Sequence, residues 1–123
     1  MARPDELRQR LLGYALTLRG AWVDHPWGED VVKAGKKVAV FFGMPEGSQY
    51  PPGMTVKLPD SQPLALAQDG VVLAGYGLGK AGWVSVTFES DMPFEMLQDW
   101  IDESYRAVAP KRVLNELEET APR

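Results

Sequence analysis

The sequence predicts an α+β fold in which a single antiparallel sheet of about five strands is covered by helices on one face and partly open on the other. Residues 54–58 and 83–88 alternate between apolar and polar side chains, as half-buried strands do. Residues 4–18 and 94–108 instead repeat apolar residues at helical spacing. Gly35 and Lys36 join two further apolar runs, which indicates a tight hairpin. The expected order is α-β-β-β-α-β-β-α.

In the first half of the chain, Pro4 suits the first turn of a helix over residues 4–18, and Gly20 is expected to end it. Residues 22–28 are expected to be a connection, followed by strands at 30–34 and 37–43. Residues 45–53 contain three prolines and two glycines, which predicts a loop. The core positions expected of the first helix are Leu7, Leu11, Tyr14 or Ala15, and Leu18.

In the second half, the expected elements are a strand at 54–58, a short helix at 62–68, a strand at 71–74, a glycine-rich loop at 75–82 and a strand at 83–88. Pro93 introduces a long helix, and Pro110 ends it and begins a short helix through Glu118. Along the last strand the core face and the more polar face alternate, and Lys57 is expected to share the polar one. That face carries Trp83, Ser85 and Thr87.

The length of 123 residues and the 45% hydrophobic content predict one domain spanning residues 1–123. The absence of cysteine excludes disulfides and cysteine metal sites, and it favours a reducing compartment. No apolar stretch is long enough for a membrane span, and the first ten residues are too polar for a signal peptide. These features predict a soluble cytoplasmic protein without a membrane partner.

The net charge of −4 argues against indiscriminate attraction to nucleic acid. The charge is nevertheless unevenly distributed. Residues 31–88 hold five lysines against three acids, a net of +2, whereas residues 89–120 hold nine acids against three bases, a net of −6. The acids are expected to form a solvated helical face, and the central part is mildly basic.

Several short segments occur in the order seen in the MmcQ/YjbR family of small bacterial proteins, which this chain resembles. The first is His25-Pro26-Trp27-Gly28-Glu29, followed by the hairpin of residues 31–42. Thr55-Val56-Lys57-Leu58 and the glycine-rich approach to Lys80 and Trp83 come next. Ser104-Tyr105-Arg106-Ala107-Val108, on the long helix, completes the resemblance.

The resemblance implies an α+β domain similar to frataxin-like and secretion-chaperone-like folds. It also implies a DNA-binding role with a double-wing motif. No cofactor is expected. Lys57, Lys80 and Trp83 match family motif positions, and the Lys36-Lys37 hairpin corresponds to a wing.

Lysines neutralise phosphates and an exposed indole stacks on an unpaired base, so a nucleic-acid surface is the first hypothesis. Because this set contains no arginine, binding is expected to follow backbone charge or shape rather than base sequence. In the alternative, the lysines keep sheet edges soluble and Trp83 packs beneath a loop. The candidate residues are Lys36, Lys37, Lys57, Lys80 and Trp83.

The second hypothesis is a protein-binding or chaperone-like adaptor that uses the same sheet and forms a homodimer. An enzyme is the least favoured class. His25 is the one histidine, and a general base or a metal ligand there is weighed against a structural hydrogen bond that fixes the turn before Trp27. The Gly77-Leu78-Gly79-Lys80 loop leads into a strand, whereas phosphate-binding glycine loops lead into a helix. We therefore expect neither a nucleotide site nor a catalytic residue.

Overall fold

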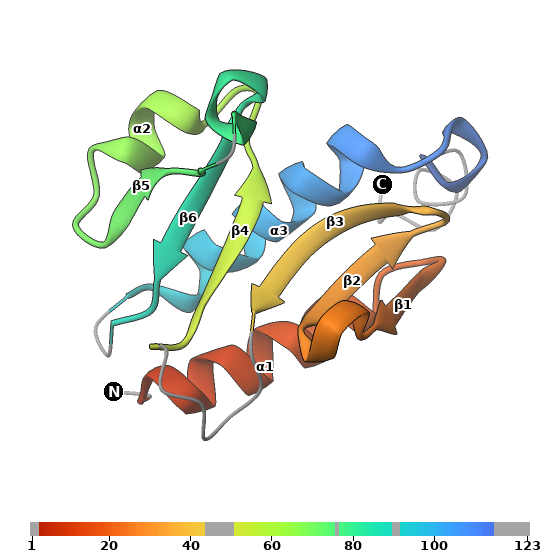
Figure 1. Ribbon diagram of the computed structural model, residues 1–123, viewed down its shortest axis with the longest axis horizontal. Helices are drawn as coiled ribbons and strands as arrows, with labels where there is room; N and C mark the ends of the chain where they lie inside the picture. The colour runs from red at the N-terminus through yellow and green to blue at the C-terminus, as the bar shows by residue number, and fades with distance from the viewer. Residues whose placement is uncertain (1–2, 44–50, 76, 90–91, 115–123) are drawn as a thin grey trace.

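A computed structural model of the protein describes residues 3–43, 51–75, 77–89 and 92–114. Its six strands form one antiparallel sheet in the order β1-β2-β3-β4-β6-β5, which confirms the α+β prediction (Figure 1). The elements in chain order are α1 (Pro4–Leu16), β1 (Ala21–Asp24), the 3-10 helix η1 (Pro26–Gly28), β2 (Asp30–Ala34), β3 (Lys37–Gly43), β4 (Gly53–Lys57), α2 (Gln62–Leu66), β5 (Val71–Leu73), the 3-10 helix η2 (Leu78–Ala81), β6 (Trp83–Thr87) and α3 (Phe94–Val108).

Strand β1 accounts for the difference from the expected strand number. It lies within the segment predicted to be a connection and pairs with β2, with Trp22 opposite Lys33. Four residues at a sheet edge, none of them fully buried, are too few to show a clear alternation in the sequence. Pairing with β2 therefore gives residues 21–24 their strand conformation, which their own sequence pattern does not indicate.

The remaining boundaries differ by a few residues. Helix α1 ends at Leu16, and Gly20 adopts a left-handed conformation with φ of 81° at the end of the turn that follows. Of the expected loop at 45–53, residues 45–50 lie outside the described residues, and Gly53 already belongs to β4. Residues 111–114 of the expected final helix are helical, and the rest of it lies outside the described residues.

The core lies between the helices and one face of the sheet. Figure 1 shows α3 crossing behind β3 and β4, with α1 along the lower rim of the sheet. Most of the apolar repeat of each helix is buried because the helices cover the strands. Leu18, Phe94 and Val108, also expected in the core, are half-buried. The opposite face of the sheet is called the second face here. Fully buried members of the core cluster include Leu11, Ala15, Val32, Val40, Val56, Val84, Leu97 and Ile101.

The sheet is divided at its centre, and α3 joins the two parts. Strands β3 and β4 pair only at Val40 with Val56 and at Phe41 with Thr55. Beyond these pairs, the Ser104 hydroxyl donates to the Ala39 carbonyl at 2.5 Å and accepts the Lys57 amide at 2.8 Å. Ser104 is 0% exposed. One helical hydroxyl thus satisfies backbone groups of both strands where the ladder ends.

Two tyrosines join α1 and the turn after it to α3. The Tyr105 hydroxyl donates to the Arg19 carbonyl at 2.7 Å, and the Tyr14 hydroxyl donates to an Asp102 carboxylate oxygen at 2.6 Å. Burial, followed by the Asp102 carboxylate, raises the pKa of Tyr14 above its ordinary range. Burial also raises the pKa of Asp102, although the hydrogen bond from Tyr14 acts in the opposite direction.

We expect Ser104→Ala to lower the free energy of unfolding by about 1–3 kcal/mol, because the Lys57 amide and the Ala39 carbonyl lose their buried partner. Urea unfolding followed by circular dichroism measures this change. The matched control is Ser85→Ala, which removes a hydroxyl from a partly exposed pair with Thr55 and should cost less than about 0.5 kcal/mol. Equal losses in the two variants would contradict the bridging role of Ser104.

We expect Tyr14→Phe to lower the free energy of unfolding at pH 7 by about 1–2 kcal/mol, because a bond to a carboxylate is lost. The raised pKa of Tyr14 favours the protonated hydroxyl in the folded state. The resulting stability is present below the unfolded tyrosine pKa of about 10 and is lost as pH rises above it. Urea unfolding at a series of pH values should therefore show the two proteins converging above pH 10, and a constant difference would disprove this account.

Candidate functional site

Three of the five residues that the sequence singles out lie together at one end of the sheet. Lys57 ends β4 and is paired with Trp83, the first residue of β6. Lys80 lies in η2, three positions before Trp83. The Leu58 amide donates to the Gly82 carbonyl at 2.9 Å and holds the two segments in contact. Lys57 is half-buried, whereas Lys80 is exposed.

Trp83 packs against protein and does not present its ring to solvent. It is 8% exposed, and its ring meets Phe41 edge-on with a centroid distance of 5.6 Å and an interplanar angle of 66°. This edge-to-face arrangement is a favourable one for two aromatic rings. The indole is therefore not exposed for base stacking in this conformation, and Trp83 packs against Phe41 of β3 in the same sheet.

The hairpin lysines belong to a different group of cations. Lys36 and Lys37 are exposed at the tip of the β2–β3 hairpin, where Gly35 adopts a φ of 66°. A Cβ atom on Gly35 would lie 3.1 Å from the Pro110 ring, so the hairpin tip touches the segment that begins the C-terminal helix. Lys111 and Arg112 follow directly and are exposed. Figure 1 shows this C-terminal segment beside the tip of the β2–β3 hairpin.

We call Lys36, Lys37, Lys111 and Arg112 the hairpin-end cluster. Sequence reasoning missed half of it, because the contact between Gly35 and Pro110 joins distant parts of the chain. The available signal was the adjacent basic pair that follows Pro110. Lys57 and Lys80 are grouped with the β4–β6 end of the sheet by the pairing of Lys57 with Trp83, and we treat them as a second group.

An acidic side chain lies close to the Lys57 group. The Glu103 carboxylate accepts the amides of Asp60 and Ser61 at 3.0 and 3.1 Å, together with the Ser61 hydroxyl at 2.6 Å. Glu103 therefore caps the turn that follows β4, and this corrects the expectation that the acids of the long helix form only a solvated face.

Lys33, by contrast, is paired within the sheet. Its ammonium group lies 2.7 Å from an Asp24 carboxylate oxygen and 5.2 Å from the centre of the Trp22 ring. The bond to Lys33, followed by that from the His25 amide, lowers the pKa of Asp24. Lys33 therefore contributes little to the positive surface of the hairpin.

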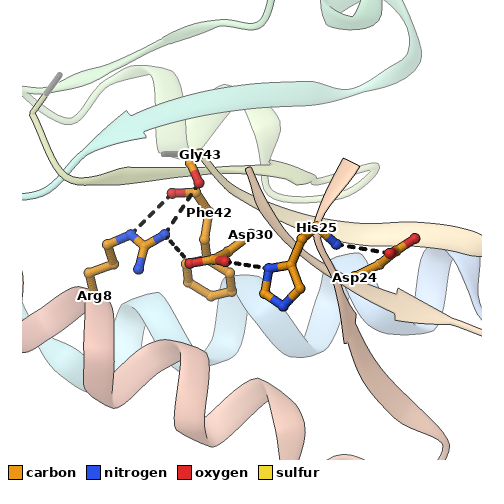
Figure 2. A network of polar contacts seen from close by, with 6 residues as sticks. All are labelled: Arg8, Asp24, His25, Asp30, Phe42 and Gly43. Carbon is orange, nitrogen blue, oxygen red and sulfur yellow. Dashed lines mark hydrogen bonds and ion pairs between the residues drawn. The ribbon is translucent and has the colours of Figure 1, made fainter. Parts of the chain in front are cut away.

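His25 belongs to a polar network at the start of β2 (Figure 2). Its Nδ1 atom lies 2.8 Å from one oxygen of Asp30, and the other oxygen of Asp30 accepts a bond of 2.8 Å from Arg8. This contact spans η1, so the structural hydrogen bond expected of His25 is present. The imidazole is 62% exposed, whereas the side chains of Asp30 and Arg8 are 13% and 5% exposed.

Arg8 is the buried centre of this network, and the sequence did not reveal it. Its guanidinium also donates to the carbonyls of Phe42 and Gly43 at 3.2 and 3.3 Å and so holds the end of β3 against α1 (Figure 2). A charge beside the apolar stripe of a helix is typical of the exposed boundary, which explains the omission. Within the described ranges, no group of three or more His, Asp or Glu residues is placed to hold a metal ion.

We expect Asp30→Asn to lower the free energy of unfolding by about 2–4 kcal/mol, because the buried guanidinium of Arg8 loses its carboxylate. His25→Gln should cost no more than about 0.5 kcal/mol, because that side chain is largely exposed. The free energies of unfolding of both variants, measured in urea, compare the contacts that the Asp30 carboxylate makes with Arg8 and with His25. An equal loss would show that the pair with Arg8 is not the dominant one.

The family model YjbR matches this chain over residues 16–107. The matched range contains every strand of the sheet and most of α3. No curated protein matches the chain. No helix among the described residues is both long and apolar enough to cross a membrane. Because the family model covers most of the sequence, the chain belongs to the YjbR family.

Proposed function

We propose that this protein is a non-enzymatic DNA-binding protein that contacts the phosphate backbone through the hairpin-end cluster. One observation carries the proposal: the Pro110 ring lies close to Gly35, so the exposed Lys111 and Arg112 directly follow a residue that touches the turn bearing Lys36 and Lys37. Four exposed cations from two segments thus share one end of the molecule. A projecting hairpin of this kind has the shape of the wing that the family resemblance implies.

Phosphate contacts supply affinity that depends on charge and salt and carry no sequence information. Lysines act as flexible point charges, which suits contact with a backbone of varying geometry. Arg112 is the one member of the cluster that is able to form bidentate bonds to phosphate. Binding is accordingly expected to be weakly dependent on base sequence, and the overall charge of −4 confines it to this end of the molecule.

Lys57 and Lys80 form the second part of the proposed surface. Lys80 is exposed and free to meet a phosphate, while Lys57 is half-buried. In this proposal Trp83 supports the surface by fixing the ends of β4 and β6, and it does not stack on bases. The Lys57 group therefore extends the contact, and the hairpin-end cluster supplies most of it.

A binding role without catalysis agrees with the surroundings of His25. Its Nδ1 atom is held by Asp30, and the same carboxylate is held by Arg8, whose other donors reach backbone carbonyls. This network fixes the junction of α1, η1 and β3. A stabilising role accounts for each of these contacts.

We expect the wild-type protein to bind a short fluorescein-labelled DNA duplex with a slope of log K against log salt concentration to which the hairpin-end cluster contributes about −3.6, since its four cations each release about 0.9 counterion. The double variant Lys36→Gln, Lys37→Gln should reduce the steepness of this slope by about 1.8 and weaken binding at low salt. Fluorescence anisotropy over a series of sodium chloride concentrations provides both quantities.

The matched control is Ala67→Glu, Gln68→Glu, which changes the net charge by the same amount at exposed positions beside α2. It should leave the slope unchanged if the contact is local. Equal weakening by both double variants would show that net charge alone governs binding. A Lys57→Gln, Lys80→Gln variant separates the contribution of the second group.

A specific observation also favours a protein-binding adaptor as the second candidate. The three most exposed large apolar side chains in the described part of the chain all lie on α2 and β5: Leu64, Val72 and Leu73 are 74%, 62% and 57% exposed. Strand β5 is at a sheet edge, where a partner strand is able to add. If the protein fails to bind duplex DNA at low salt, the DNA proposal fails and this edge becomes the leading candidate surface.

A further inference from the structure

The second face contains a hollow of about 870 Å³, within the range of small-molecule sites. We call it the second-face hollow. It lies over the central strands and is bounded by the start of β2 and by the segment before and within η2. Its lining includes Glu29, Phe41, Thr55, Gly75, Leu78 and Ser85.

The strand register explains why a hollow forms there. Phe41, Thr55 and Ser85 are cross-strand partners, so their side chains form one row across β3, β4 and β6. Thr55 and Ser85 have small side chains. The sheet surface at these two residues, the floor of the hollow, is therefore lower than the Phe41 ring on one side and η2 on the other. The Phe41 ring forms one wall of the hollow, and the edge-to-face contact with Trp83 holds that ring in place.

The polar side chains in the described lining of the hollow are three hydroxyls and one carboxylate: Thr55, Ser85, Thr87 and Glu29. The Thr55 and Ser85 hydroxyls lie 3.1 Å apart and share one hydrogen bond, which leaves one hydroxyl proton and several lone pairs for a ligand. Among the described lining residues Glu29 is the one that carries a charge. The hollow therefore disfavours phosphates and carboxylates and favours a cation.

We propose that the second-face hollow binds a flat aromatic small molecule that carries a positive charge. The apolar and aromatic lining removes the ring system from water, and the two floor hydroxyls orient it. Glu29 and the ring of Phe41 both attract the cationic part. This site is distinct from the hairpin-end cluster, because its lining contains no lysine or arginine among the described residues.

The cationic dye thioflavin T is the probe that tests the site. Titration into ¹⁵N-labelled protein should shift the amide signals of Phe41, Thr55 and Ser85, with saturation at one molecule per chain. Ser85→Leu raises the floor and should abolish these shifts, whereas Ser85→Ala keeps the room but removes one of the two orienting hydroxyls and should only weaken binding. Binding that persists in Ser85→Leu, or shifts that cluster elsewhere, would overturn the proposal.

A second pair of variants keeps the test decisive if Ser85→Leu does not fold. Gly75 lines the hollow, and a Cβ atom there meets nothing within 4 Å. Gly75→Leu should therefore narrow the hollow without strain and weaken thioflavin T binding. Gly13→Leu is the matched control, because Gly13 is exposed on α1 and is also free of contacts within 4 Å of such an atom. Equal binding by these two variants would contradict the assigned location.

The charge preference is tested separately with Glu29→Gln. This variant should weaken thioflavin T binding by about threefold, as expected for a partly exposed charge pair. It should not weaken binding of the anionic dye 8-anilinonaphthalene-1-sulfonate, which the wild-type hollow is expected to bind less well than thioflavin T. A wild-type preference for the anionic dye would disprove the cationic class of ligand, whatever the outcome of the DNA titration.

Discussion

The division of the sheet between β3 and β4 is the constraint on which the rest of the structure depends. Two strands that separate after two paired positions would leave buried backbone groups without partners. The hydroxyl of Ser104 supplies those partners from α3, so the helix that covers the core also replaces part of the ladder. The position of α3 is consequently fixed along its axis as well as by apolar packing, and Tyr105 and Asp102 then hold α1 and its turn against it.

The two faces of the sheet differ because of this arrangement. On the core face, α1 and α3 cover continuous rows of branched and aromatic side chains. On the second face, small polar residues occupy the middle of the row at Thr55 and Ser85, and Phe41 packs edge-to-face against Trp83. Lys37 and Lys57 lie at strand ends, and Lys36 and Lys80 lie in the connections between strands. The proposed site for a cationic ring and the proposed site for phosphate therefore use different residues of one small domain.

Much of the fold could be predicted from the sequence, because α3, β4 and β6 each bury one regular face and so show a regular period. Strand β1 could not be predicted, since four edge residues acquire their strand conformation by pairing with β2. Arg8 was missed for a related reason: only the carbonyls of β3 and the carboxylate of Asp30 make its burial favourable.

The candidate site was predictable only in its parts. The hairpin lysines stand out in the sequence, but their neighbours Lys111 and Arg112 depend on a tertiary contact with Gly35. The sequence left two alternatives for Trp83. A tryptophan on the polar face of a strand either exposes its ring to a ligand or packs its ring against the protein, and periodicity alone does not distinguish the two. The contact with Phe41 decides between them.

The contact between Pro110 and Gly35 also bears on how the surface is related to the family. The matched region ends at residue 107, so the hairpin lies inside it and the basic pair at 111 and 112 lies outside. The domain defined by the family therefore supplies one half of the hairpin-end cluster, and the segment that follows it supplies the other. Affinity for an anionic partner is thus able to diverge between proteins that share this fold, through changes in a few residues that leave the sheet and its helices untouched.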